Sequence, residues 1–430
     1  MKKIFTLIAL MLATSSIASA YTWKGSGTQS DPYLIENAQQ LDEIRTLPEN
    51  KDANNYFKLT VDIDLATWGE WRPLNDAPYN RVIHLDGNGY VISNLTSVNL
   101  DDVNPDLSNA KRQYSGLFGT VVGSVKNLGV INANVKSIGR AGILGGYVGV
   151  NNSGDGVVEN CYITGKIEGT RTTGGIGGLI STANSYIKNC HANVEVTLIS
   201  GGSSGFAVGG IVAQQNVDNQ VVNCVAEGTV TTVAEQAGGI IGLGNAVSCV
   251  ALNTSVNSNT GTGKVGRVSG ELKSAAQTSY AISSMKLTNG STAVTPGSNT
   301  AAGGSYDGTA KTAAELATAA TYATLFGDAW GTIWSDKLVD GKPALAWYAK
   351  RQQSSSNEPI TVDDVKVSLT NGLVNVTGAD VKNITIYNIS GTVCKNVNNT
   401  NQTELNAGQG IYIIKLETAN GTSVHKVVNK

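Results

Sequence analysis

The chain is poor in charged residues and in several side chains that carry chemistry. Of its 430 residues, 15% are charged, against about 25% in an average soluble protein, and only three are histidine and five cysteine. The formal net charge is −2. Because nucleic acids and anionic membranes bind strongly basic surfaces, neither is expected as a partner.

Two common catalytic motifs are also missing from the sequence. There is no H-E-x-x-H motif of the zinc peptidases and no P-loop for nucleotide phosphates. The sequence therefore predicts no metal and no cofactor, and it favours a protein that is not an enzyme.

Residues 1–20 have the layout of a secretory signal peptide. Two lysines precede an apolar run from Ile4 to Ala13, and small residues follow up to Ala20, where we expect cleavage. No later stretch contains the roughly 18 to 20 apolar residues that a membrane-spanning helix needs. The sequence therefore predicts an exported chain with no transmembrane segment after cleavage.

The chain is rich in glycine, with 50 residues, and it is internally repetitive. Two independent series recur about every 30 residues, a period typical of solenoid proteins. The first consists of glycines that precede an apolar pair: Gly116, Gly146, Gly178, Gly210, Gly239 and Gly266. The second consists of one leucine and four cysteines: Leu128, Cys161, Cys190, Cys224 and Cys249.

The pattern within each repeat is that of short strands. After each cysteine, small or apolar residues alternate with polar ones, as in a strand with one buried face. Another apolar series lies three residues before the cysteines, an odd offset that one continuous strand cannot bury on the same face. A corner must therefore lie between the two series, at Asn127, Asn160, Asn189 and Asn223. We expect two or three short strands per coil, stacked as a right-handed parallel β-helix.

In such a stack, equivalent residues of successive coils form ladders spaced about 4.8 Å apart. Side-chain amides of the corner asparagines can then hydrogen-bond from coil to coil, a structural role that we favour over sugar binding. The cysteines would lie in a line, whereas zinc needs convergent ligands and a disulfide needs a particular S–S dihedral angle. Because Leu128 holds the same position, we expect Cys161, Cys190, Cys224 and Cys249 to be reduced, buried core residues.

The repeats resemble a known family. The elements GLFG, GGLIS, GGIVA and GGIIG, each with the Asn-Cys strand that follows, resemble the GLUG repeat of bacterial surface proteins, which also occurs beside some immunoglobulin A protease domains. The segments GSGTQSDPYLIENAQQLDEIR before the repeats and DGKPALAWY after them resemble the usual ends of such proteins. The resemblance covers roughly residues 22–350 and implies a right-handed β-helix in a secreted or surface protein.

We therefore divide the solenoid into three parts: an N-terminal cap with the first coils at 21–110, the repeats at 111–285, and a C-terminal cap at 286–350. Short helices, expected within 37–45 and 312–322, would cover the strand edges at the two ends. All six tryptophans lie outside the repeats, where we expect them to fill the cap cores.

The composition changes at residues 351–359, RQQSSSNEP, which predicts a flexible linker. Residues 360–430 then alternate apolar and polar side chains between Asn-Gly and Ser-Gly turns, which predicts a small Ig-like β-sandwich of about seven strands. The segments IYNISG, GIYIIKL and HKVV resemble the C-terminal sorting domain of type IX secretion cargo. This resemblance implies an export machinery as a partner and secretion from, or display on, a Gram-negative bacterium. A plain Ig-like module is the alternative.

Parallel β-helices can host polysaccharide lyases and hydrolases, whose sites need clustered carboxylates. The candidates are Asp62, Asp64 and Asp86, with Arg81 and His84 nearby in the sequence. Their surroundings, VDIDL and LDGNG, equally fit strand ends and a turn. A catalytic role is therefore an alternative to a structural one.

Within the repeats, Glu168, Glu195 and Glu227 follow their cysteines at different distances, so we expect no shared carboxylate site. His191 has the outward parity of its strand and is expected to be solvated. The favoured hypothesis is a secreted or cell-surface binding protein, adhesin-like, that engages glycans or proteins through the faces of the β-helix. Two alternatives stay open: a β-helix carbohydrate-active enzyme and a structural spacer of the cell surface.

Overall fold

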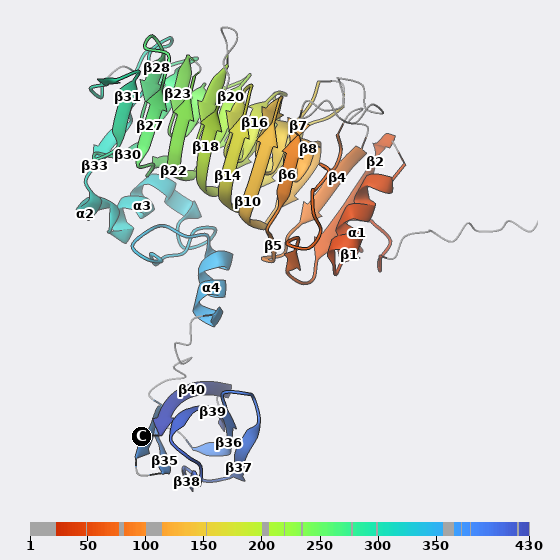
Figure 1. Cartoon of the computed structure of the whole chain (residues 1–430), viewed down its shortest axis with the longest axis vertical. Coiled ribbons are helices and arrows are strands. Elements are labelled where there is room, and N and C mark those ends of the chain that lie inside the picture. The colour runs from red at the N-terminus through yellow and green to blue at the C-terminus, as the bar shows by residue number, and fades with distance from the viewer. Residues whose placement is uncertain are drawn as a thin grey trace, which may run out of the picture. The chain divides into compact units, whose positions relative to one another are not determined.

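The computed structural model describes residues 23–48, 50–76, 81–99, 114–151, 153–199, 206–218, 220–233, 235–276, 278–297, 300–355, 365–370, 372–378, 380–418 and 421–429. The expected signal peptide at 1–20 and residues 356–359 of the expected linker lie outside the described residues. The chain forms two compact units, Met1–Trp347 and Tyr348–Lys430 (Figure 1).

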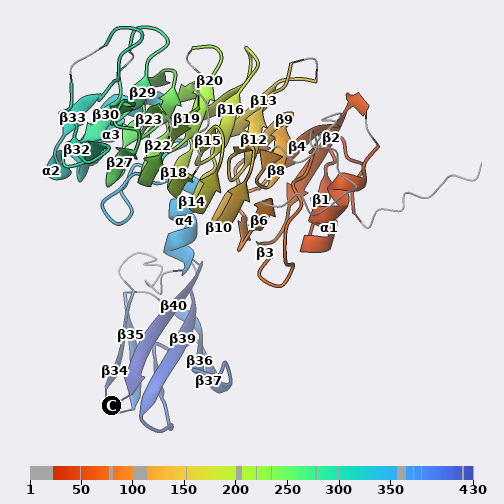
Figure 2. The ribbon, with the colours of Figure 1, turned by 45° about the horizontal axis from the view of Figure 1, so that its top comes forward.

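The first unit is a parallel β-solenoid of about 8 turns, which confirms the fold class predicted from the repeats. Its strands stack coil upon coil in four sheets, and neighbouring coils pair in parallel (Figures 1 and 2). Sheet 1 contains β1 (Tyr33–Ile35), β2 (Asn50–Leu59), β4 (Arg81–Asp86), β9 (Gly123–Lys126), β13 (Gly156–Glu159), β17 (Tyr186–Lys188), β21 (Val221–Val222) and β25 (Ala246–Val247).

The other three sheets complete each coil. Sheet 2 contains β3 (Ile63–Asp64), β5 (Val91–Ser93), β6 (Thr96–Asn99), β10 (Gly129–Ser137), β14 (Tyr162–Gly169), β18 (His191–Leu198), β22 (Val225–Thr232), β26 (Val250–Ala251), β27 (Ser255–Ser258), β30 (Tyr280–Ile282), β31 (Lys286–Asn289), β32 (Thr292–Ala293) and β33 (Thr309–Lys311). Sheet 3 contains β7 (Tyr114–Ser115), β11 (Arg140–Ala141), β15 (Thr173–Gly174), β19 (Ala207–Gly209), β23 (Gln236–Gly238) and β28 (Lys264–Gly266). Sheet 4 contains β8 (Phe118–Val121), β12 (Gly145–Val148), β16 (Gly177–Ile180), β20 (Val212–Gln215), β24 (Ile241–Leu243) and β29 (Ser269–Glu271).

A typical coil therefore has four strands rather than the two or three expected from the sequence. The extra corner lies in the glycine-rich segment, between the strands of sheets 3 and 4. There Gly174, Gly209, Gly238 and Gly266 pair from coil to coil. A Cβ at any of these four would lie 2.0 to 2.2 Å from the carbonyl oxygen three residues later, so no side chain fits the turn. Gly266 of the glycine series expected from the sequence belongs to this row. Gly210 and Gly239 each lie one residue after the row's glycine in their coil, and Gly178 lies four residues after it. Each repeat has several glycines, and the period alone cannot choose among them.

The corner between sheets 1 and 2 is formed by asparagines in a left-handed backbone conformation. Asn127, Asn160, Asn189 and Asn223 have φ between 52° and 56°, and Ser248 takes the same place in the next coil with φ of 51°. Asparagine adopts this conformation at less cost than most other residues with a side chain. The side chain that follows each corner then points inward: Cys161, Cys190, Cys224 and Cys249 are fully buried, free thiols.

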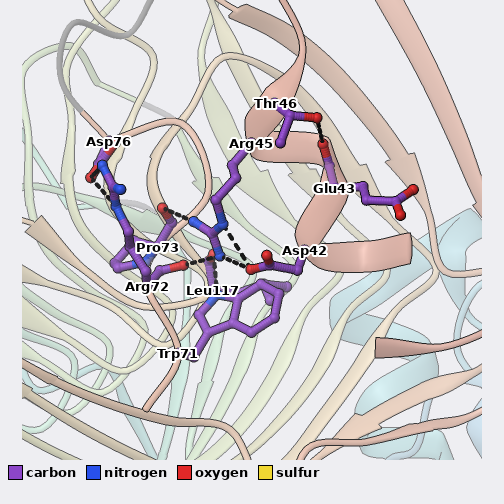
Figure 3. Close-up of polar contacts among 9 residues, drawn as sticks. All are labelled: Asp42, Glu43, Arg45, Thr46, Trp71, Arg72, Pro73, Asp76 and Leu117. Carbon is purple, nitrogen blue, oxygen red and sulfur yellow. Dashed lines mark hydrogen bonds and ion pairs between the residues drawn. The ribbon is translucent and has the colours of Figure 1, made fainter. Parts of the chain in front are cut away.

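The N-terminal cap begins with the helix expected there. Asn37 caps α1 (Ala38–Glu43) by accepting a hydrogen bond from Gln40 N at 2.9 Å, and η1 (Ile44–Thr46) follows. Figure 3 shows the Arg45 guanidinium paired with Asp42 and donating to the Arg72 carbonyl at 2.7 Å, while its carbon lies 5.2 Å from the Trp71 ring centre. These contacts hold the helix against the loop that follows β3.

The C-terminal cap contains α2 (Ala313–Leu316), α3 (Ala319–Phe326) and η3 (Gly327–Ala329) (Figure 1). Thr312 and Glu315 form the expected capping box. The segment 312–347, which we call the strap, starts beside the last coil and runs back along the outer face of sheet 2. Trp334 lies 6.2 Å from His191, ring centre to ring centre, and Trp347 Nε1 donates to the Asn160 carbonyl at 3.0 Å.

Two expectations differ from the structure, the first because of the strap and the second because a helix extends into the expected linker. His191 is not solvated but buried, since the strap covers the face toward which it points. Residues 351–355 of the expected linker continue α4 (Ala346–Ser355), whose alanine, lysine, arginine and glutamine residues are good helix formers.

The described residues of the second unit form seven antiparallel strands in a β-sandwich-like arrangement, as expected. One sheet contains β34 (Lys366–Thr370), β35 (Leu373–Thr377) and β38 (Gln402–Glu404). The other contains β37 (Val393–Asn398), β36 (Val381–Asn388), β39 (Gly410–Thr418) and β40 (Gly421–Asn429). Val374, Ile384, Ile386, Ile414 and Leu416 are fully buried in its own hydrophobic core.

A candidate ligand groove on the first coils

An open groove of about 590 Å³ lies on the outer face of sheet 1, where it is lined by residues of β2, β4, β9 and β13 and of the segment just before β1. Both the segment before β1 and the strands contribute side chains to this lining. The lining residues are Gln29, Ser30, Pro32, Tyr56, Phe57, Lys58, His84, Leu85, Asp86, Gly123, Ser124, Lys126, Asn127 and Val157.

Two rows of side chains run across the groove from strand to strand and continue onto the strands beyond it. The strand period of two places alternate residues outward, while Phe57, Leu85 and Val125 between them are buried. One row is mainly aromatic and polar, with one valine, and it consists of Tyr56, His84, Ser124, Val157 and Tyr186. The other alternates in charge, and it consists of Lys58, Asp86, Lys126, Glu159 and Lys188. All ten side chains are partly exposed.

His84 is held in one orientation at the centre of the groove. Its ring stacks on Tyr56 with 4.4 Å between centres, Nδ1 lies 3.0 Å from Ser124 Oγ, and Nε2 lies 3.1 Å from Asn54 Oδ1. Because an amide oxygen can only accept, Nε2 carries the proton and Nδ1 accepts from the serine. Burial, and next the charge of Lys126, lower the pKa of His84, so the ring is neutral at neutral pH.

A serine bonded to a neutral histidine is also the arrangement that activates a nucleophile. Acyl transfer further needs donors aimed at the developing oxyanion. Along parallel strands, backbone N–H groups donate to the neighbouring strands and not to the space above the sheet. The described strands therefore orient the Ser124 hydroxyl but direct no backbone N–H group toward it.

The three candidate aspartates do not form one site. Asp86 is in sheet 1 and lines the groove, whereas Asp64 is in sheet 2. Asp62 Oδ1 accepts from Val91 N at 3.0 Å, and Asp64 Oδ1 accepts from Asn94 Nδ2 at 2.7 Å. The hydrogen bond from Asn94 is the main cause of the lowered pKa of Asp64. The structure thus gives these carboxylates roles in turns and corners.

Two of these aspartates each head a row of asparagine amides. Asn127 Nδ2 donates to Asp86 Oδ1 at 3.0 Å, and Asn160 Nδ2 donates to Asn127 Oδ1 at 2.7 Å. In sheet 2, the second row runs from Asn132 to Asn94 at 2.6 Å and from Asn94 to Asp64. Farther along the first corner, Asn223 Nδ2 donates to Asn189 Oδ1 at 3.2 Å. The sequence pointed to the first asparagine series but not to its aspartate or to the second row.

A buried charge cluster that sequence reasoning missed lies beneath the strap. Glu227 of β22 bonds His191 Nε2 at 2.8 Å and pairs with Lys342 of the strap. Burial opposes ionisation of Glu227, but the hydrogen bonds and charges of His191 and Lys342 lower its pKa to about 2. No local signal links residues 191, 227 and 342, because the strap brings them together from a distance in the sequence.

Two features are absent from the described residues. Within them, no three or more His, Cys, Asp or Glu side chains are grouped to hold a metal ion. Nor does any helix in the described ranges have the length and apolar character needed to cross a membrane.

The fold defines the chain as a parallel β-solenoid protein with a C-terminal β-sandwich-like unit. It is similar to the crystal structure of "a putative immunoglobulin A1 protease from Bacteroides ovatus", with a TM-score of 0.63 and 28% sequence identity over 75% of this chain and 94% of the other. Residues 354–428 match the family model of a domain of unknown function, DUF6383.

Two relatives are similar in sequence. The chain is 30% identical over 167 residues to a "Putative Gly-rich membrane protein" of Evansella cellulosilytica, and 29% identical over 178 residues to "Halomucin" of Haloquadratum walsbyi. Each match covers 37% of this chain but spans only 18% and 2% of the respective relative. These likenesses are consistent with a surface protein.

Proposed function

We propose that the chain is a secreted or cell-surface binding protein, adhesin-like, that engages a glycan through the groove on sheet 1. The observation that carries the proposal is the groove itself, an open channel on which an aromatic and polar row runs beside a charged row. The similarity to a "Putative Gly-rich membrane protein" and to "Halomucin" supports the location.

The repeat of the rows suits a linear polymer. Strands of successive coils lie about 4.8 Å apart, which is close to the length of one sugar ring in a chain. A sugar presents an apolar ring face and hydroxyl groups, and the groove offers Tyr56 with polar partners such as Ser124 on the next strands. An open groove also admits a polymer that extends beyond its ends.

The two ends of the chain complete the proposal. Residues 1–20 would direct export, and residues 360–430 would act in sorting to the outer surface of a Gram-negative bacterium, with an export machinery as the partner. The resemblance of the repeats to GLUG-containing surface proteins supports this view.

The binding proposal is tested with the full chain on panels of glycans and extracellular-matrix proteins. Tyr56→Ala should weaken glycan binding at least tenfold, because the ring is part of the groove lining. Tyr186→Ala is the matched control, since Tyr186 belongs to the same row but not to the groove lining. Binding to no glycan, or equal losses in both variants, would rule out this groove as the site. Binding to matrix proteins alone would point to a protein ligand instead.

A further inference from the structure

Most polar groups in the groove are already engaged. Both ring nitrogens of His84 have partners, and the Asn127 amide donates to Asp86 while accepting from Asn160. Besides the Gln29 side chain, the Tyr56 hydroxyl and the Lys58 ammonium of the lining make no hydrogen bond or ion pair within the residues that the structure describes. A ligand can therefore bind these two groups without displacing an existing contact.

These two free groups lie together. Tyr56 and Lys58 are two residues apart on β2, so their side chains leave the same face of the strand, and both line the groove. Lys58 is partly buried. A cation that has lost part of its hydration gains most from an anionic partner, because a charge-assisted hydrogen bond replaces the lost water.

The charges around Lys58 do not neutralise it by direct contact. Lys126, the other lysine of the lining, is paired with Glu159 at 3.2 Å. Asp86 is the register neighbour of Lys58, but its Oδ1 accepts from Asn88 N at 2.8 Å and from the Asn127 amide. Because His84 is neutral, Lys58 is the cation of the described lining that has no paired anion.

We infer that the groove takes an acidic sugar, whose carboxylate binds between the Lys58 ammonium and the Tyr56 hydroxyl. This inference rests on the proposed glycan binding and names the class of glycan. A neutral sugar would fill the same groove but would leave Lys58 without a counter-ion. The carboxylate is therefore the feature that distinguishes the ligand.

The test compares each acidic glycan with its own uncharged form. The full chain is titrated with uronic acid and sialic acid oligosaccharides and with their methyl esters, which keep the size and shape of the sugar. At least one acid should bind about ten- to a hundredfold more tightly than its ester, the range of a charge-assisted hydrogen bond. Raising the salt concentration should reduce this ratio, because salt screens exposed charges.

Two lysine variants locate the effect. Lys58→Gln should bring the affinity for the acid down to that for the ester, whereas Lys188→Gln, in the same charged row but outside the groove, should leave the ratio unchanged. Acids and esters that bind equally, or no binding of the acids by a chain that binds neutral glycans, would overturn the inference and leave the glycan proposal standing. Equal losses in both lysine variants would also overturn it, since general charge attraction would then suffice. A chain that binds no glycan at all would remove the proposed function itself.

Discussion

The ion cluster beneath the strap gives the sharpest stability prediction. Glu227 has a pKa lowered from 4.5 to about 2 in the folded protein. One pKa unit corresponds to about 1.4 kcal/mol, so the ionised carboxylate contributes up to about 3.5 kcal/mol to the free energy of unfolding at neutral pH. Because half of the Lys342 side chain is exposed, we expect about 2 to 3 kcal/mol. Glu227→Gln, which keeps the shape and removes the charge, should lose this contribution.

The pH dependence follows from the direction of the shift. A carboxylate whose pKa is lowered by folding contributes fully above its unfolded pKa, and the contribution disappears as the pH falls from about 4.5 to about 2. The difference between the wild type and Glu227→Gln should therefore be largest near pH 7 and vanish near pH 2. Urea unfolding followed by tryptophan fluorescence measures it, because Trp334 packs beside the cluster.

Glu195→Gln is the matched control, since Glu195 lies on the neighbouring strand β18 but is exposed. This variant should change the free energy of unfolding by less than about 0.5 kcal/mol. Equal effects of the two substitutions at pH 7, or a Glu227→Gln effect that is the same at pH 2 and pH 7, would refute the assignment.

Three further predictions concern the solenoid. Gly238→Ala should destabilise the chain by at least about 1–3 kcal/mol in urea unfolding, because its Cβ would lie 2.0 Å from the Ile241 carbonyl oxygen; a neutral effect would contradict the tight corner. Alkylation of the folded, unreduced protein should modify Cys394 alone, and all five cysteines after unfolding; a pair that resists alkylation and lacks two mass units would reveal a disulfide. Burial raises the pKa of Cys190 and Cys249, which further limits their reactivity. Asp86→Ala should cost about 1–3 kcal/mol by leaving Asn127 Nδ2 without its acceptor, and polysaccharide turnover that is abolished by this substitution would instead establish the enzyme alternative.

The parts of the fold that could be predicted are those that repeat. Cys161 and its equivalents recur at one register, and the offset from the apolar residue three before them requires a corner, which the positive φ of Asn160 provides. Packing against the next coil requires a buried residue and a corner at the same places in each repeat. The sequence pattern therefore indicates these tertiary contacts directly.

The parts that could not be predicted depend on contacts that occur once. The parity of His191 correctly places it on the outer face of β18, but nothing near it indicates that Trp334 and Lys342 will cover Glu227 and this histidine. The groove was missed for a similar reason. Tyr56, His84 and Ser124 meet because of the coil register, while the sequence separates them by stretches of different length.

The asparagine rows have a direction. Every side-chain hydrogen bond in them points the same way along the solenoid, with Asn160 donating to Asn127 and Asn132 donating to Asn94. Each of these two rows ends on an aspartate, whose carboxylate can only accept. Asn127 both accepts from Asn160 and donates to Asp86, so a duplicated copy of this corner would join the row without leaving its amide unmatched. The first coils cannot be exchanged in this way, because the aspartate is the terminus at which the row stops. Duplication of a repeat is therefore compatible with the asparagine row in the middle of the solenoid, but not at its N-terminal end.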